Sequence, residues 1–83
     1  MDKEHVKAKL VEILKQDYYI KEVQISEDAN LARDLDLDSL DKVECIMKIE
    51  KEFKISIPDD DAENLETFGQ IVDFVFKQIN DKL

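Results

Sequence analysis

The chain has 83 residues, 43% of them hydrophobic, which is enough for one small core and too few for two. One glycine and one proline provide too few turns for a many-stranded sandwich or barrel, so an all-α fold is predicted. The 21 acidic and 12 basic residues give a net charge of -9, which argues against nucleic acids and anionic membranes as partners and favours proteins with basic patches.

The first predicted helix covers residues 3–16, where apolar residues recur every three or four positions. Asp2 is its expected N-cap, and Tyr18 and Tyr19 are expected to close it against the core. The apolar period then breaks down over residues 17–38, and a connection of about twenty residues is long enough to suggest a function of its own. The residues expected to attach this connection to the core are Leu31, Leu35 and Leu37.

A second helix is predicted over residues 39–53, where side chains placed at steps of about 100° form two apolar arcs. The arc assigned to the core contains Ile46, Ile49 and Phe53. The other arc, predicted to be partly exposed, contains Leu40, Val43 and Met47. Glu44 and Glu50 flank this second arc, so an apolar strip edged with acid is expected to dock transiently on basic partners.

The rest of the chain predicts one short helix and one long one. Pro58 ends the second helix, and a short acidic helix is expected over residues 59–64. Thr67 and Gln70 match a capping box at the start of the last helix. Its predicted apolar face consists of Phe68, Ile71, Val72, Val75, Phe76 and Ile79. The predicted fold is therefore a single domain over residues 1–83, with three main helices and one short helix.

The motif Asp38-Ser39-Leu40-Asp41 presents a serine hydroxyl where the long connection becomes a helix. No base is obviously paired with this hydroxyl, because the only histidine is His5, far back in the sequence, and no lysine has an evident pairing with Ser39. Any chemistry at Ser39 must therefore be performed by another enzyme, and the chain itself is not predicted to be one. A plain helix N-cap at Asp38 or Ser39 remains the simpler interpretation of the motif alone.

No metal site is predicted. Asp34, Asp36 and Asp38 alternate as at the start of a calcium-binding loop, but its required glycine and glutamate would be Ser39 and Cys45. Weak nonspecific cation binding to the acidic surface is expected instead.

The single cysteine, Cys45, excludes an internal disulfide and is interpreted as a packing residue of a protein in a reducing compartment. The first residues contain no apolar signal core and no run is long enough to span a bilayer, so a cytoplasmic location is expected. His5 has no ligand partners at metal spacing and is predicted to face solvent.

The segment from Leu31 to Asp41, with the sequence LARDLDLDSLD, resembles the central motif of the acyl carrier proteins. The resemblance covers nearly the whole chain and continues through Val43-Glu44, Met47, Ile49-Glu50, Glu52-Phe53, Ile57-Pro58-Asp59 and Ala62-Glu63. It implies a four-helix bundle whose second helix begins at Ser39. It also implies that a phosphopantetheinyl transferase moves 4'-phosphopantetheine from coenzyme A onto Ser39, and that acyl groups travel as thioesters on the terminal thiol.

The resemblance further implies a monomer that docks on basic surfaces of acyl-synthesising and acyl-transferring enzymes. The carboxylates to which it gives a recognition role are Asp38, Asp41, Glu44 and Glu50. The apolar contacts are Leu40, Val43 and Met47.

The chain departs from the family's pattern at several positions. Asp36 stands where many members have glycine, which is tolerable because aspartate enters left-handed geometry more easily than most residues. Arg33 falls where an acid is common, and three lysines, Lys48, Lys51 and Lys54, interrupt the acidic face. These departures leave open a carrier for aminoacyl or polyketide units in a specialised pathway. An unmodified acidic helical adaptor and a calcium sensor are the alternatives from other classes.

Overall fold

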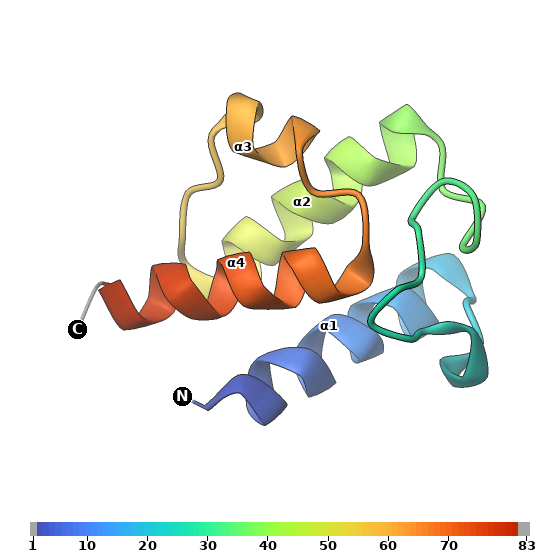
Figure 1. The fold of residues 1–83 in the computed structure, drawn as a ribbon, viewed down its shortest axis with the longest axis horizontal. Helices are drawn as coiled ribbons and strands as arrows, with labels where there is room; N and C mark the ends of the chain where they lie inside the picture. Colours follow the sequence, from blue (N-terminus) through green and yellow to red (C-terminus); the bar gives the residue numbers. More distant parts are fainter. Residues whose placement is uncertain (1, 82–83) are drawn as a thin grey trace.

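The computed structural model describes residues 2–81, which form four α-helices and a short 3-10 helix (Figure 1). The elements are α1 (Lys3–Tyr18), η1 (Glu22–Gln24), α2 (Ser39–Phe53), α3 (Asp59–Glu63) and α4 (Phe68–Asp81). The predicted all-α fold is confirmed, and α2 has the predicted bounds. Two ends differ, because α1 continues two residues beyond the prediction and α3 stops one residue earlier.

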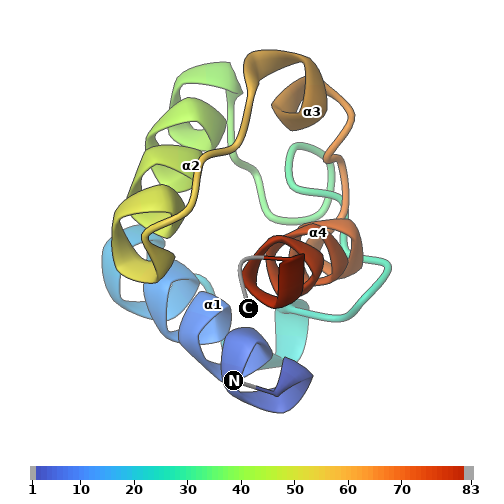
Figure 2. The ribbon, with the colours of Figure 1, turned by 90° about the vertical axis from the view of Figure 1, so that its left-hand side faces the viewer.

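Side chains from all parts of the bundle meet in one core. α1 packs against both α2 and α4, and Figure 2 shows α3 between α2 and α4 at the top of the view. The most deeply buried large side chains come from α1, α2 and α4 and are Val6, Ile49, Phe68 and Val75. A void lined by core side chains that include Leu10, Ile49 and Phe68 measures only about 10 Å³, so α1, α2 and α4 pack closely around it.

The long connection between α1 and α2 lies at the end of the bundle where α2 begins (Figure 1). As predicted, its leucines Leu31, Leu35 and Leu37 are buried. Its backbone is also bound to the start of α4: the Leu31 N–H donates to the Glu66 carbonyl at 2.9 Å, and the Phe68 N–H donates to the Ala29 carbonyl at 3.0 Å. The connection is therefore an ordered part of the fold that fixes where α2 starts.

One prediction about the end of α1 is wrong. Tyr18 is half-buried against the core as expected, but the side chain of Tyr19 is 88% exposed. Tyr19 has a φ of 57°, and its N–H donates to the Leu14 carbonyl as a left-handed C-cap. The reversal of the backbone that ends the helix turns this side chain away from the core.

The start of α4 confirms the predicted capping box. The Gln70 N–H donates to the Thr67 hydroxyl at 3.2 Å, and the Gln70 side chain accepts from the Thr67 N–H at 3.0 Å. Gly69 lies between Thr67 and Gln70 in the sequence, and its N–H donates to the Glu27 carbonyl at 2.9 Å. A Cβ atom at Gly69 would lie 2.8 Å from that carbonyl oxygen, so the close approach of the connection to α4 requires glycine here.

Candidate functional site

Ser39 is the first residue of α2, and its side chain is exposed. The helix is capped by Asp38, whose Oδ1 accepts from the Asp41 N–H at 2.8 Å, while Asp41 Oδ2 accepts from the Asp38 N–H at 3.3 Å. The capping interpretation of the motif is therefore correct for Asp38. Because the aspartate performs this task, the Ser39 hydroxyl takes no part in capping and is accessible to a modifying enzyme.

The backbone before Ser39 is held by hydrogen bonds of its own. Asn30 Oδ1 accepts from the N–H groups of Ala32 and Arg33, and Asp34 Oδ2 accepts from the Asn30 N–H at 2.8 Å. Asp36 has a φ of 57°, a left-handed geometry that aspartate adopts more easily than most residues. These contacts hold the approach to α2 in place and present Ser39 at the end of the bundle.

The same contacts bear on the calcium interpretation of this segment. Asp34 and Asp38 each use a carboxylate oxygen for a backbone N–H. Within residues 2–81, no group of three or more His, Cys, Asp or Glu side chains is arranged to hold a metal ion.

The outer face of α2 carries the predicted apolar strip. Leu40, Val43 and Met47 are 79%, 57% and 61% exposed, respectively. On the opposite arc Ile46 and Ile49 are buried and Phe53 is partly buried against the core. The division of the helix into a core arc and an exposed arc is confirmed.

Glu44 belongs to a side-chain cluster between α1 and α2. Its Oε1 accepts from the Tyr18 hydroxyl at 3.0 Å and lies 3.4 Å from Lys48 Nζ. Lys48 Nζ also lies 3.3 Å from Asp17 and 4.9 Å from the centre of the Tyr18 ring. The pairing of Glu44 with Lys48 could be predicted, because Lys48 follows one helical turn later. The contacts from Tyr18 and Asp17 of α1 could not, because they depend on how α1 packs against α2.

Glu50 also has a structural partner that sequence reasoning missed. Its Oε2 accepts from the Ile57 N–H at 2.8 Å, which ties the last turns of α2 to the segment that leads into α3. Ile57 is buried beneath this contact. Glu50 is therefore half-buried and supports the loop, in addition to lying beside the apolar strip.

A groove of about 490 Å³ lies between α2 and α3. Ser39 lies at its α2 side, and its apolar lining includes Val43, Ile46, Met47 and Ile57. This volume falls within the usual range of small-molecule sites. Ser39 thus lies at a partly apolar groove on the surface of the bundle.

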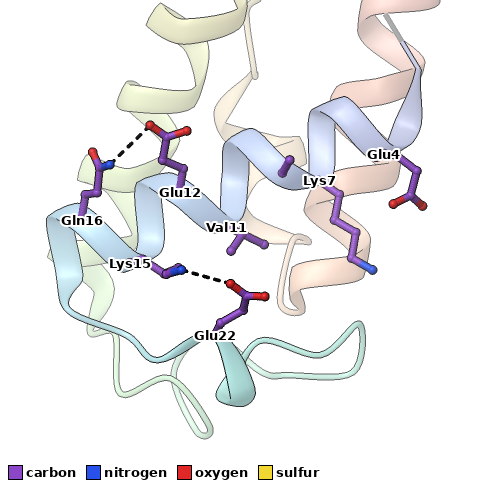
Figure 3. Close-up of a pocket in the computed structure, with 8 residues that line it drawn as sticks. Glu4, Lys7, Val11, Glu12, Lys15, Gln16 and Glu22 are labelled. Carbon is purple, nitrogen blue, oxygen red and sulfur yellow. Dashed lines mark hydrogen bonds and ion pairs between the residues drawn. The ribbon is translucent and has the colours of Figure 1, made fainter.

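A second groove, of about 440 Å³, lies between α1 and Glu22 of η1 (Figure 3). Its walls are largely charged, and the Lys15–Glu22 ion pair at 3.0 Å crosses it. It shares no residue with the groove beside Ser39.

Cys45 and His5 lie where the sequence places them. Cys45 is buried, and burial raises the pKa of its thiol to about 11, which makes it an inert packing residue. His5 is exposed in the first turn of α1, where its N–H donates to Asp2 Oδ1 at 2.9 Å.

Comparison with known proteins gives a consistent family. The sequence profile of the family described as "Phosphopantetheine attachment site" matches residues 8–75. The acyl carrier protein of Amoebophilus asiaticus is 39% identical over 77 residues, which cover 93% of this chain and 96% of the relative. That of Guillardia theta is 39% identical over 79 residues, covering 95% and 98%.

A solved structure of the acyl carrier protein from Enterococcus faecalis has a TM-score of 0.81 and 33% identity, and the match covers 94% of this chain and 99% of that one. The fold and the attachment-site profile define a small helical carrier of a phosphopantetheine arm. The chain belongs to the acyl carrier protein family. It carries acyl groups on covalently attached 4'-phosphopantetheine, and the family works with a phosphopantetheinyl transferase and with biosynthetic enzymes. No helix within residues 2–81 is both long enough and apolar enough to cross a bilayer.

The residues at the start of α2 fit such an arm. Ser39 is exposed and would hold the arm through a phosphodiester on its hydroxyl, and the adjoining groove would supply apolar surface to an extended chain. Backbone N–H groups at a helix start also favour an anion.

Proposed function

We propose that Ser39 carries the 4'-phosphopantetheine arm and that the chain, as a monomeric single domain, shuttles acyl thioesters between enzymes of fatty acid or related biosynthesis. The observation that carries this proposal is the exposed Ser39 hydroxyl, left out of the Asp38–Asp41 capping box at the start of α2. A cytoplasmic location suits this role, because acyl transfer needs a free thiol and reducing compartments preserve one.

The attachment step requires an external enzyme. The Oγ of Ser39 forms a bond to the phosphorus that bears pantetheine in coenzyme A, the pyrophosphate P–O bond breaks, and adenosine 3',5'-bisphosphate leaves. The hydroxyl proton passes to a base on the transferase, since no described side chain accepts a hydrogen bond from Ser39. The carrier itself catalyses no step.

The outer face of α2 is proposed as the docking surface. Leu40, Val43 and Met47 supply exposed apolar contacts near the attachment point. Four carboxylates lie around these apolar side chains, and we propose that partner enzymes recognise them. They are Asp38, Asp41, Glu44 and Glu50. Each uses one oxygen for a contact within the protein, and the other oxygen has no partner among the described residues. These free oxygens are available to steer basic groups of partner enzymes towards Ser39.

Modification by a promiscuous phosphopantetheinyl transferase with coenzyme A, read by intact mass, tests the proposal. We expect the mass of one phosphopantetheinyl group to be added to the wild-type protein and none to be added to Ser39→Ala. An unmodified wild-type protein would instead favour an acidic adaptor. Modification that persists in Ser39→Ala would place the arm elsewhere.

The pathway is tested separately. Identification of the thioester-bound groups on protein purified from its native cells distinguishes fatty acyl cargo from aminoacyl or polyketide units. Fatty acyl groups are expected. A specialised pathway is the second candidate, because Lys48 and Lys51 interrupt the acidic face on the later turns of α2.

A further inference from the structure

We propose that Lys42 is a positioning residue that pairs with the phosphodiester on Ser39 and holds the first part of the arm over the groove between α2 and α3. This inference rests on the proposed attachment at Ser39. The phosphodiester adds a negative charge at the start of α2, which is already rich in carboxylates, and Lys42 would compensate part of that charge.

The start of α2 is a costly place for another anion. Asp38 and Asp41 face each other across the capping box, and Asp36 precedes them. The Asp41 N–H, which could otherwise face the phosphodiester, already donates to Asp38 Oδ1 at 2.8 Å. The cap therefore already uses some of the backbone N–H groups that would favour an anion, and the surrounding carboxylates repel the negative charge of the phosphodiester.

Lys42 is placed to offset this repulsion. It follows Ser39 by three positions on α2, so the two side chains lie on the same face, with Cβ atoms about 5–6 Å apart. Side chains on a helix lean towards its N-terminus, which directs the Lys42 ammonium back over the first turn. A flexible lysine can reach a phosphodiester at Ser39 from this position.

The groove supports the same pairing. Ser39 and Lys42 both line it, and Lys42 is the one basic residue among the described residues that do so. The acidic groups on its walls are Glu50, Asp59 and Glu63. None of them lies within ion-pair distance of Lys42, which has no salt-bridge partner within residues 2–81. Its charge is available at the serine end of the groove.

Nuclear magnetic resonance of the apo and modified proteins tests the pairing directly. The Lys42 side-chain ammonium signal is expected to shift when Ser39 is modified, whereas that of Lys51 on the same helix is not. The shift should shrink between roughly 0.1 and 1 M salt, as the screening length falls from about 10 Å to about 3 Å. The phosphorus signal of the modified protein should move in Lys42→Gln and stay unchanged in the matched control Lys51→Gln.

Intact mass measured on each sample separates the two levels of the proposal. If one phosphopantetheinyl group is present and the Lys42 signal is the same in the apo and modified proteins, the pairing is disproved while the attachment at Ser39 stands. Equal phosphorus signals in wild type and Lys42→Gln would lead to the same conclusion. If no group is added at Ser39, the proposed function fails and the pairing falls with it.

Discussion

The Tyr18 hydroxyl donates a hydrogen bond to Glu44 Oε1 at 3.0 Å, so the last residue of α1 holds a carboxylate of α2 in place. Lys48 approaches the same oxygen at 3.4 Å and stacks over the Tyr18 ring at 4.9 Å from its centre. Burial, with the hydrogen bond to Glu44, raises the pKa of Tyr18, which keeps its hydroxyl protonated as a donor. Glu44 is thereby oriented, and part of its charge is compensated within the protein.

The first prediction follows from this compensation. In Lys48→Gln the Glu44 carboxylate loses its intramolecular cation, so the efficiency of modification by a basic transferase should rise about two- to fivefold at low salt. Lys51→Gln changes the net charge equally but alters an exposed residue with no salt-bridge partner within residues 2–81, and should have a smaller effect. Steady-state kcat/KM measured against salt concentration gives the comparison. Equal gains in the two variants would mean that only net charge matters and that Lys48 does not shield Glu44.

Local and long-range contacts explain which features could be read from sequence. The starts of α1, α2 and α4 were predictable because Asp2, Asp38 and Thr67 each cap a helix through hydrogen bonds to residues three positions away. The exposed strip on α2 followed from helical geometry alone. The partners of Glu44 and Glu50 were not predictable, since they depend on how α1 and the loop before α3 pack against α2.

The second prediction concerns the left-handed residue that ends α1. Tyr19→Gly should raise the free energy of unfolding by up to about 1 kcal/mol, because glycine adopts a φ of 57° without the strain of a Cβ atom. Tyr19→Ala is the control. It removes the same side chain, which is 88% exposed, but keeps the strained geometry, and should leave stability nearly unchanged. Chemical denaturation of the three proteins measures both effects, and equal stability of the two variants would contradict the role of backbone strain.

The third prediction tests the close approach of the connection to α4. Gly69→Ala should destabilise the fold by about 1–2 kcal/mol, because the new Cβ would lie 2.8 Å from the Glu27 carbonyl oxygen. Helix propensity alone favours alanine over glycine by about 1 kcal/mol, so the expected sign is opposite to that of an unconstrained site. Asn80→Ala, at an exposed position of the same helix, serves as the control. A thermal unfolding midpoint that rises in Gly69→Ala would rule out a tight contact.

The fourth prediction is a loss of stability at alkaline pH. Burial raises the pKa of the Cys45 thiol from its ordinary value of 9.0 to about 11. A folded-state pKa above the unfolded one contributes stability that is complete below pH 9.0 and is lost as the pH rises towards 11. The loss attributable to Cys45 is roughly 2–3 kcal/mol.

Unfolding free energies at about pH 7 and about pH 10.5 measure most of this loss, which is complete only above the folded-state pKa of about 11. Cys45→Ala should be less stable at neutral pH because it leaves a small cavity, yet it should lose less on going to the higher pH. Tyr18→Phe removes the partly buried tyrosine whose pKa is also raised, so it separates the contribution of Tyr18 from that of Cys45. A pH dependence identical in wild type and Cys45→Ala would show that the thiol ionises without opposing the fold.

The fifth prediction separates the two possible roles of Glu50. Its Oε2 accepts from the Ile57 N–H at 2.8 Å, so Glu50→Ala should lose about 1–2 kcal/mol by leaving that N–H without an acceptor. Glu50→Gln keeps an acceptor oxygen and removes the charge, and should recover most of the stability. If the carboxylate serves only to support the loop, Gln also restores the rate of modification by the transferase. If the charge itself attracts partners, Glu50→Gln restores stability, but its rate of modification by the transferase and the salt dependence of that rate stay as low as in Glu50→Ala. We expect the second outcome, because Oε1 has no partner among the described residues and Glu50 is only half-buried.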